Sequence, residues 1–249
     1  MWMLLHGFSG SPRSWDEVVA RAQLDPDPLR PALAGHGSDW RLVGTRAFDD
    51  EVSRLNAMAF GLGRPRLICG YSMGARVALG MLVSRPELWD GALLIGAHPG
   101  LAYELARAER RASDGVSARM LRTEGLVPFV NAWEQLPLFR SQRELSGPAL
   151  ATQRSIRLGH DAEGLAHALD VLGLAEMPNY GAMLSSFSGP ITLMAGACDA
   201  KFSGIAGAIA RDNSNVDAVL VEGVGHNVVL EAPGTVAAAL NRFQSKVSE

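Results

Sequence analysis

Lysine is almost absent from this sequence. Of its 23 basic residues only two, Lys201 and Lys246, are lysines, and all the others are arginines. A single arginine is therefore weak evidence for a binding site, because most arginines are expected to be solvated surface charges. The net charge of −3 also lacks the positive excess that is typical of proteins binding nucleic acid or anionic membranes. We therefore predict neither a nucleic-acid partner nor a membrane partner.

Cysteine and long apolar segments are also scarce. The two cysteines, Cys69 and Cys198, lie in apolar strand-like runs, so we expect buried free thiols in a reducing compartment rather than a disulfide. No apolar run approaches the roughly 20 residues of a membrane span. The opening segment MWMLLHGFSG lacks the basic region and the cleavage site of a signal peptide. These absences predict a cytoplasmic protein, and they leave open whether it is a monomer or a small homo-oligomer.

The sequence does contain short apolar runs that alternate with helix-like segments. The apolar runs are residues 1–5, 29–33, 66–70, 91–96, 191–196 and 217–223. Helical spacing is found in residues 14–24, 47–61, 74–85, 203–211 and 232–244. This alternation predicts a mainly parallel sheet that is covered by helices on both faces. The pattern Ser14-Trp15-Asp16-Glu17 also predicts a capping box at the start of the first helix.

Residues 101–180 break this alternation, because they contain several helix-like segments and no convincing strand. We therefore predict a core formed by residues 1–100 and 181–249, and a helical cap formed by residues 101–180. Residues 101–160 hold nine arginines and six acidic residues, whereas the rest of the chain is acidic. A cationic cap above an acidic core would suit a small anionic ligand, but random variation of the surface explains this charge difference equally well.

A nucleophile-elbow pattern lies between the third apolar run and the following helix. Gly70-Tyr71-Ser72-Met73-Gly74 places Ser72 on a sharp turn, and its glycines allow the strand and the helix to approach closely. The pattern alone also fits an ordinary glycine-rich turn. Its position between a strand and a helix favours an exposed serine that a neighbouring base could activate.

Such a serine needs a histidine to accept its proton and a carboxylate to orient that histidine. Among the six histidines, His226 alone follows the last predicted strand, and Asp199 follows the strand before it. Both would lie at the same sheet edge as Ser72. Asp217 and Glu222 are weaker candidates for the acid because they lie within or at the end of a strand.

Backbone N–H groups near Ser72 could stabilise an oxyanion. In this arrangement one donor is the residue after the serine, and the other lies in the turn after the first strand. These positions correspond to Met73 and to Phe8 in the segment LLHGFSGS. Their amides matter more than their side chains.

These segments together resemble the α/β-hydrolase fold over almost the whole chain. In detail, HGFSGSPRSWDEV, GYSMGARVAL, HPGL with RAERRASD, FVNAWEQLPLF, CDAKF and GHNVVLEAP are similar to one family. It is the 2-succinyl-6-hydroxy-2,4-cyclohexadiene-1-carboxylate synthase family of menaquinone (vitamin K2) biosynthesis. The resemblance implies a lyase that needs no metal or organic cofactor. Its members usually have two earlier strands, so we expect a sheet with shortened N-terminal strands.

The resemblance also implies the chemistry and the binding residues. Ser72, deprotonated through His226 and Asp199, would remove a proton next to a succinyl ketone, and pyruvate would leave. The small substrate carries three carboxylates, which arginine binds well through its planar guanidinium group. Matching the family motifs implies the substrate-binding residues Tyr71, Arg76, Arg110, Trp133 and Arg157. Arg107 and Arg111 compete with Arg110, and Arg154 competes with Arg157.

Two other functions remain possible from the sequence. A serine carboxylesterase or thioesterase acting on a small anionic ester would use the same three residues, with Ser72 as a covalent nucleophile. A small-molecule receptor without activity would also have this fold, although it would not need the complete set of Ser72, His226 and Asp199.

Overall fold

The centre of the molecule is a parallel sheet. The computed structural model describes residues 1–37 and 39–248. Within them, five strands follow one another across the sheet in sequence order, and all neighbours pair in parallel. They are β1 (Trp2–Leu5), β2 (Leu67–Tyr71), β3 (Gly91–Ile95), β4 (Ile191–Gly196) and β5 (Val216–Val221). The predicted mainly parallel sheet is confirmed.

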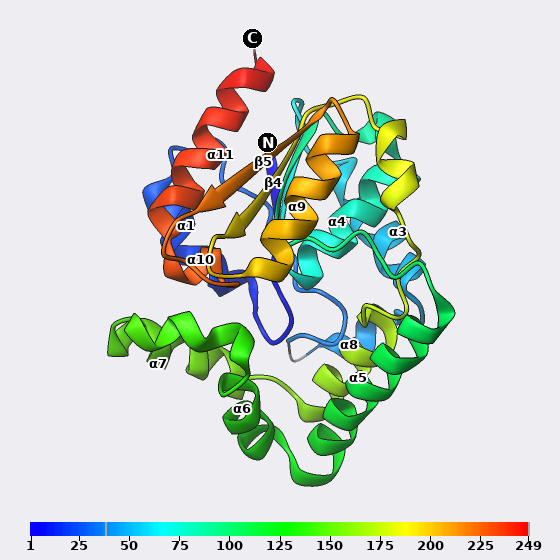
Figure 1. The fold of residues 1–249 in the computed structure, drawn as a ribbon, viewed down its shortest axis with the longest axis vertical. Helices are drawn as coiled ribbons and strands as arrows, with labels where there is room; N and C mark the ends of the chain where they lie inside the picture. Colours follow the sequence, from blue (N-terminus) through cyan, green and yellow to red (C-terminus); the bar gives the residue numbers. More distant parts are fainter. Residues whose placement is uncertain (38, 249) are drawn as a thin grey trace.

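Helices cover both faces of this sheet (Figure 1). One face carries α1 (Asp16–Arg21) and α11 (Pro233–Ser248), and the other carries α3 (Phe48–Ala59), α4 (Met73–Ser84) and α9 (Ala200–Asp212). Each face has its own apolar core, with Trp15 and Phe243 in the first and Phe48 and Met81 in the second. Because both faces are covered, the strands β1 to β3 are buried along their whole length.

Between β3 and β4 the chain leaves the sheet and forms helices beyond the carboxyl ends of the strands (Figure 1). These helices are α5 (Glu104–Glu124), α6 (Leu126–Glu134), α7 (Gly147–Leu158) and α8 (Ala162–Leu172), with η3 (Pro137–Glu144) between α6 and α7. Phe129 and Leu165 belong to a separate apolar core within this segment. We refer to residues 101–180 as the cap.

Short helical segments complete the described chain. They are η1 (Pro12–Trp15), α2 (Trp40–Val43), η2 (Pro86–Leu88), η4 (Gly181–Ser186) and α10 (Val228–Glu231). Among the described residues, no helix combines the length and the apolar character needed to cross a membrane.

Two local predictions were wrong. The apolar run 29–33 is not a strand, since only Leu29 bridges to Met3; Pro31 lacks the N–H that a paired strand needs. The capping box also begins one turn earlier than predicted. Ser11 is the N-cap of η1, and the Ser14 hydroxyl accepts the Ser11 N–H at 3.1 Å. Pro12 after the cap explains this start, because its fixed φ suits the first helical position.

The expectation for the cysteines was correct for one of them. Both cysteines are free, and Cys69 in β2 is buried, but Cys198 is exposed. Strand β4 ends at Gly196, two residues before Cys198. Cys198 therefore lies in the loop that leads into α9 rather than within the sheet.

Candidate active site

Ser72, His226 and Asp199 form a continuous hydrogen-bonded chain at the carboxyl edge of the sheet. The Ser72 Oγ lies 3.0 Å from Nε2 of His226, and Nδ1 of His226 lies 2.7 Å from Oδ2 of Asp199. Ser72 follows β2, Asp199 lies in the loop after β4, and His226 lies in the loop after β5. Asp199 and His226 are buried, whereas Ser72 is partly exposed. This geometry allows His226 to take a proton from Ser72.

The turn at Ser72 is strained in the way that the glycine pattern predicts. Ser72 has φ 52° and ψ −106°, which is a conformation that residues with a Cβ rarely adopt. A Cβ at Gly74 would lie 2.3 Å from the Leu5 carbonyl oxygen, and one at Gly70 would lie 2.5 Å from the Gly74 carbonyl oxygen. The two glycines therefore let α4 begin directly against β1 and β2, with Ser72 at its N-terminal end.

The environment of Asp199 keeps it ionised. Burial alone would raise its pKa, but the hydrogen bond to His226 and the amide of Phe202 bring the pKa of Asp199 below its usual value. An ionised Asp199 fixes the proton of His226 on Nδ1, which leaves Nε2 free to accept from Ser72. Phe202 also packs on the His226 ring at a centroid distance of 4.5 Å.

The two candidate oxyanion donors lie on either side of the Ser72 turn. Met73 is the first residue of α4, so its amide has no carbonyl partner within the helix. Phe8 lies in a tight turn in which the Gly10 N–H donates to the Gly7 carbonyl at 3.0 Å. A Cβ at Gly7 would lie 2.7 Å from the ring of Tyr71, so this turn packs tightly against the residue before Ser72.

Arg76 and Arg110 lie together on one side of the site. Arg76 is buried, and burial and the nearby Arg110 charge lower its pKa to about 9, with Asp114 acting in the opposite direction. Arg110 itself donates to Asp114 at 2.8 Å. The two alternatives to Arg110 have other partners: Arg107 donates to the Met177 carbonyl, and Arg111 donates to Glu176.

Arg157 and Trp133 lie with Tyr71 and Phe8 in a second group. Arg157 is buried, which lowers its pKa, while its hydrogen bond to Glu134 at 3.0 Å opposes this effect. The alternative, Arg154, binds the same carboxylate but is more exposed. Trp133 packs edge-to-face on Phe8, and its buried Nε1 donor has no hydrogen-bond partner among the described residues. A bound ligand could accept from this N–H.

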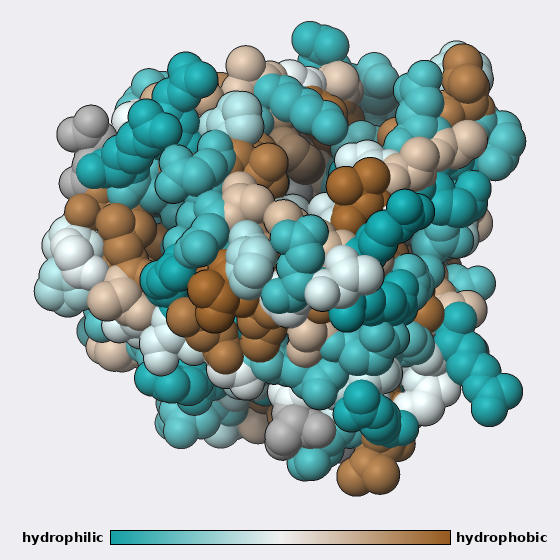
Figure 2. Space-filling view, turned by 90° about the horizontal axis from the view of Figure 1, so that it is seen from below, coloured by the Kyte–Doolittle hydropathy of each residue, from teal (hydrophilic) through white to brown (hydrophobic). Residues whose placement is uncertain are grey.

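A cavity of about 550 Å³ adjoins this second group between α7 and the η1–α1 segment. Phe8, Tyr71, Phe139 and Arg157 line its inner part, and Arg13 and Arg21 line its outer part. Seen from the cap side, the molecular surface is mostly hydrophilic, with separate hydrophobic patches (Figure 2). Of the three candidate arginines, only Arg157 lines this cavity.

Several residues near the site were not predicted to belong to it. His98 faces Arg76, Arg110 and Lys201; burial and then these charges lower its pKa to about 4. Lys201, one of the two lysines, also lowers the pKa of Asp199. The position of Lys201, two residues after Asp199 in a chain with only two lysines, could have indicated a role beside Asp199. Ser141 of η3 contacts Gly225, beside His226, and no sequence pattern indicated this contact.

The described residues contain no group of three or more histidine, cysteine or acidic side chains arranged to hold a metal ion. The site brings together a hydrogen-bonded serine, histidine and aspartate, two candidate amide donors, the pair Arg76 and Arg110, and the single buried cation Arg157. This arrangement can remove a proton and can bind a small molecule that carries more than one negative charge.

Comparison with known proteins gives consistent results. Residues 3–239 match the model of the "Alpha/beta hydrolase family". The 2-succinyl-6-hydroxy-2,4-cyclohexadiene-1-carboxylate synthase of Enterobacter sp. (strain 638) is 34% identical over 243 residues, which are 96% of this chain and 90% of the relative. The structure of MenH from S. aureus is 28% identical with a TM-score of 0.90, over 100% of this chain and 94% of that one.

A thermophilic esterase from Thermogutta terrifontis, solved with malate bound, has a TM-score of 0.82 at 23% identity, over 100% of this chain and 90% of that one. This likeness shows the fold alone. Enzymes with different activities thus share the backbone described here, so the side chains of the site must distinguish between them.

Proposed function

The chain belongs to the α/β-hydrolase family and, within it, to the 2-succinyl-6-hydroxy-2,4-cyclohexadiene-1-carboxylate synthases, which are lyases of menaquinone biosynthesis, and we propose that Ser72 is the base of its reaction. The substrate is 2-succinyl-5-enolpyruvyl-6-hydroxy-3-cyclohexene-1-carboxylate. The reaction eliminates pyruvate and forms the cyclohexadiene product. The alternative is a hydrolase that uses the same Ser72 as a covalent nucleophile.

The proposed reaction begins with proton transfer. His226 accepts the proton of Ser72, and Asp199 stabilises the imidazolium that forms. The Ser72 oxygen then removes the proton next to the succinyl ketone. The electron pair of that C–H bond forms a new double bond, the ring double bond shifts, and the C–O bond to the enolpyruvyl group breaks. The leaving group receives a proton and becomes pyruvate.

Negative charge develops on the ketone oxygen while the proton leaves. The amides of Phe8 and Met73 are proposed to donate to this oxygen, since donors fixed in advance stabilise such charge with little rearrangement. The buried cations are proposed to hold the carboxylates. Arg76 and Arg110 would bind at one side of Ser72, and Arg157 with Trp133 would bind at the other.

The observation that carries the elimination over ester hydrolysis is the burial of Arg76 beside Arg110. Among the described residues these two cations, one of them buried, share the single carboxylate of Asp114, so an excess of positive charge remains that favours an anionic ligand. A neutral ester supplies no such anion, whereas the tricarboxylate does, so this observation favours the elimination over hydrolysis of a neutral ester. The geometry at Ser72 alone would fit either reaction.

The test compares two substrate classes with the same purified protein. Pyruvate release from the enolpyruvyl substrate is measured beside hydrolysis of a panel of p-nitrophenyl esters. We expect kcat/KM for pyruvate release to exceed that for every ester in the panel. The reverse order, with burst kinetics on the esters, would favour the hydrolase.

A further inference from the structure

Two buried histidines that the proposed reaction does not use hold the turn that carries Phe8. His6 Nδ1 lies 2.8 Å from the Gly7 carbonyl oxygen, and the Ser9 N–H donates to Nε2 of His36 at 3.1 Å. The two rings pack edge-to-face with their centroids 4.8 Å apart. Both side chains are buried. The peptide groups on both sides of Phe8 are thus each bound by one imidazole.

The partners of the four ring nitrogens define where the protons are. The Leu33 N–H points to Nε2 of His6 at 3.1 Å, and the Ser9 N–H points to Nε2 of His36. Because a backbone N–H can only donate, both Nε2 atoms must accept and carry no proton. The Nδ1 atoms face the carbonyls of Gly7 and Ala34, so they carry the protons. Both rings are therefore neutral.

Burial favours this neutral state. It lowers the pKa of His6 to about 4 and that of His36 well below the usual value. A third histidine, His160 just before α8, packs edge-to-face on His36 at 5.3 Å and opposes a positive charge on either ring. Glu51 and Arg54, which bind backbone groups of the loop that bears His36, form an ion pair with each other.

His6 acts on the peptide group that contains the proposed oxyanion donor. The Gly7 carbonyl and the Phe8 N–H belong to one planar trans peptide, so fixing the oxygen also fixes the direction of the N–H. A proton donated to the oxygen also polarises the peptide, which makes its N–H a stronger donor. The bond from His6 therefore affects both the direction and the strength of the Phe8 N–H.

His36 holds the next peptide group in an unfavourable turn. Ser9 is the third residue of the turn from Gly7 to Gly10. Its φ is 57°, a value that is usually found for glycine at this position of a turn. Rotation of the Phe8–Ser9 peptide would relieve this strain, but it would break the bond from the Ser9 N–H to His36. Ser9 itself provides no compensating bond, because its buried hydroxyl has no partner among the described residues.

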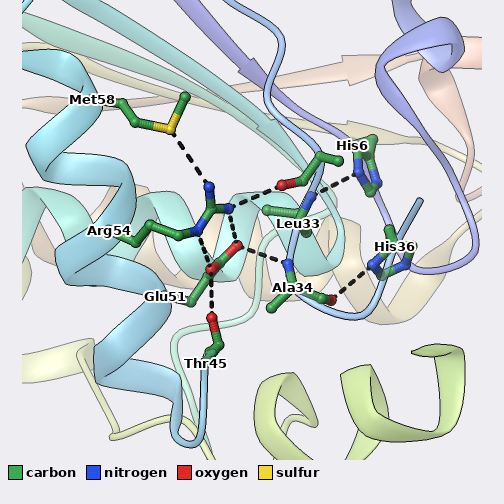
Figure 3. A network of polar contacts seen from close by, with 9 residues as sticks. His6, Leu33, Ala34, His36, Thr45, Glu51, Arg54 and Met58 are labelled. Atoms are coloured by element: carbon green, nitrogen blue, oxygen red, sulfur yellow. Dashed lines mark hydrogen bonds and ion pairs between the residues drawn. The ribbon is translucent and has the colours of Figure 1, made fainter. Parts of the chain in front are cut away.

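The loop that bears His36 is itself fixed to α3 (Figure 3). The buried Glu51 carboxylate accepts the Ala34 N–H at 2.9 Å and binds Arg54 through two further hydrogen bonds. Arg54 donates to the Ala32 carbonyl at 2.9 Å. A continuous set of hydrogen bonds thus connects α3, through residues 32–36, to the turn at Phe8.

We propose that His6 and His36, as neutral imidazoles, are positioning residues that hold the Phe8 amide in the direction required for the oxyanion hole. This inference rests on the proposed function, because it assumes that the Phe8 amide binds the oxyanion. Neither histidine touches the substrate or the reacting atoms.

The first test is spectroscopic and needs no substrate. Imidazole ¹⁵N chemical shifts at neutral pH should show His6 and His36 with the proton on Nδ1. His6→Asn retains a donor near the position of Nδ1, whereas His6→Leu does not. Since both variants lose the ring, a difference between their Phe8 amide shifts reports the hydrogen bond. A proton on Nε2, a charged ring, or identical Phe8 shifts would overturn the proposal.

The second test is kinetic. We expect His6→Leu and His36→Leu each to lower kcat by about 10- to 100-fold, with KM changed less than about threefold. This loss of kcat should be smaller than the loss caused by removing an oxyanion donor completely, because the Phe8 amide is misdirected rather than absent. His6→Asn keeps a hydrogen-bond donor and His36→Gln keeps an acceptor, so each should recover part of kcat. Ser9→Gly should also improve His36→Leu, since glycine favours this turn without help from His36.

His167 provides the matched control. Its ring also binds a backbone carbonyl, that of Thr45 at 2.9 Å, but it does not contact the turn at Phe8. Equal losses of kcat in His167→Leu and His36→Leu, or no recovery by Ser9→Gly, would overturn the proposal. If the wild-type protein released no pyruvate, the proposed function would fail, whereas the ¹⁵N result would still decide the role of the histidines.

Discussion

The guanidinium group of Arg76 donates to the carbonyl oxygen of Leu172, at 2.8 Å from Nη1, and to no carboxylate in the part of the chain that the structure describes. Leu172 ends α8 of the cap, whereas Arg76 lies on α4 of the core. A buried cation that binds only a peptide oxygen retains donors for an anion. This contact also links the cap to the helix that begins at Ser72.

Replacing Arg76 should separate binding from stability. We expect Arg76→Met to lower kcat/KM for the enolpyruvyl substrate by about 10- to 100-fold, the value of one charged hydrogen bond. The free energy of unfolding should change little, because the substitution has two opposing effects. It removes an unpaired buried charge, which destabilises the fold, and it removes the hydrogen bond to Leu172, which stabilises the fold. Steady-state kinetics and urea denaturation measure the two effects.

Arg111→Met is the control for Arg76→Met. Arg111 is half exposed and pairs with Glu176, away from Arg76. Its replacement should leave kcat/KM unchanged. Similar losses in both variants would show that the effect comes from the overall charge rather than from a site at Arg76.

Ser72→Gly should be inactive and more stable than the wild-type protein. The φ of 52° at Ser72 is strained for a residue with a Cβ, and glycine adopts it freely. Glycine relieves this strain, but it also increases the entropy of the unfolded chain. The net effect should raise the free energy of unfolding by about 1 kcal/mol. Ser72→Ala, which keeps the Cβ, should lose activity without this gain. Equal stability of the two variants in urea would contradict the strain at Ser72.

The stability of the protein should fall as the pH is lowered from about 6.5 toward 4. Burial lowers the pKa of His6 from 6.5 to about 4, and it lowers the pKa of His36 and His160 as well. In this range the unfolded chain binds protons that the folded chain does not. Each such histidine therefore adds a slope of about 1.4 kcal/mol per pH unit to the free energy of unfolding.

Urea denaturation at a series of pH values measures this slope. His6→Asn removes one of the groups and should reduce the slope by about the amount of one histidine. A free energy of unfolding that is constant between pH 7 and 4.5 would show that these rings take up protons in the folded protein as readily as in the unfolded chain.

A methyl group at residue 225 should disturb the site through the cap. The Cβ of an alanine there would lie 2.0 Å from Oγ of Ser141, a residue of η3, and the adjacent residue is His226. We expect Gly225→Ala to lower kcat by about 10-fold or more, because small displacements of catalytic groups are costly. Ser141→Gly in the same protein should restore much of the activity. Failure of this rescue would mean that the cap does not press on the His226 loop.

The sequence alone predicted the parts of the molecule that depend on local patterns. Ser72, Asp199 and His226 each follow a strand of a parallel sheet, so their meeting at one edge follows from the order of the elements. The alternation of apolar runs predicted the sheet itself. Errors arose where a single residue overrides the pattern, as Pro31 does in the run 29–33.

The remaining features depend on packing between distant segments. Whether Arg157 or Arg154 is buried is decided by how α7 packs against η3 and the core, and helical spacing does not contain this information. The same is true of the contact between Ser141 and Gly225. The histidines at positions 6, 36 and 160 had no recognisable spacing, because their relationship arises only when the loop 29–37 and the start of α8 reach the turn after β1.

The central claim is that Ser72 acts as a base in an elimination. It is tested most directly by a single turnover of the enolpyruvyl substrate, quenched at intervals, in which pyruvate and the intact mass of the enzyme are measured together. The proposed mechanism predicts one pyruvate for each substrate consumed and an unchanged enzyme mass at every time point. No release of pyruvate, or a transient adduct on Ser72 that forms and decays at the rate of turnover, would contradict it.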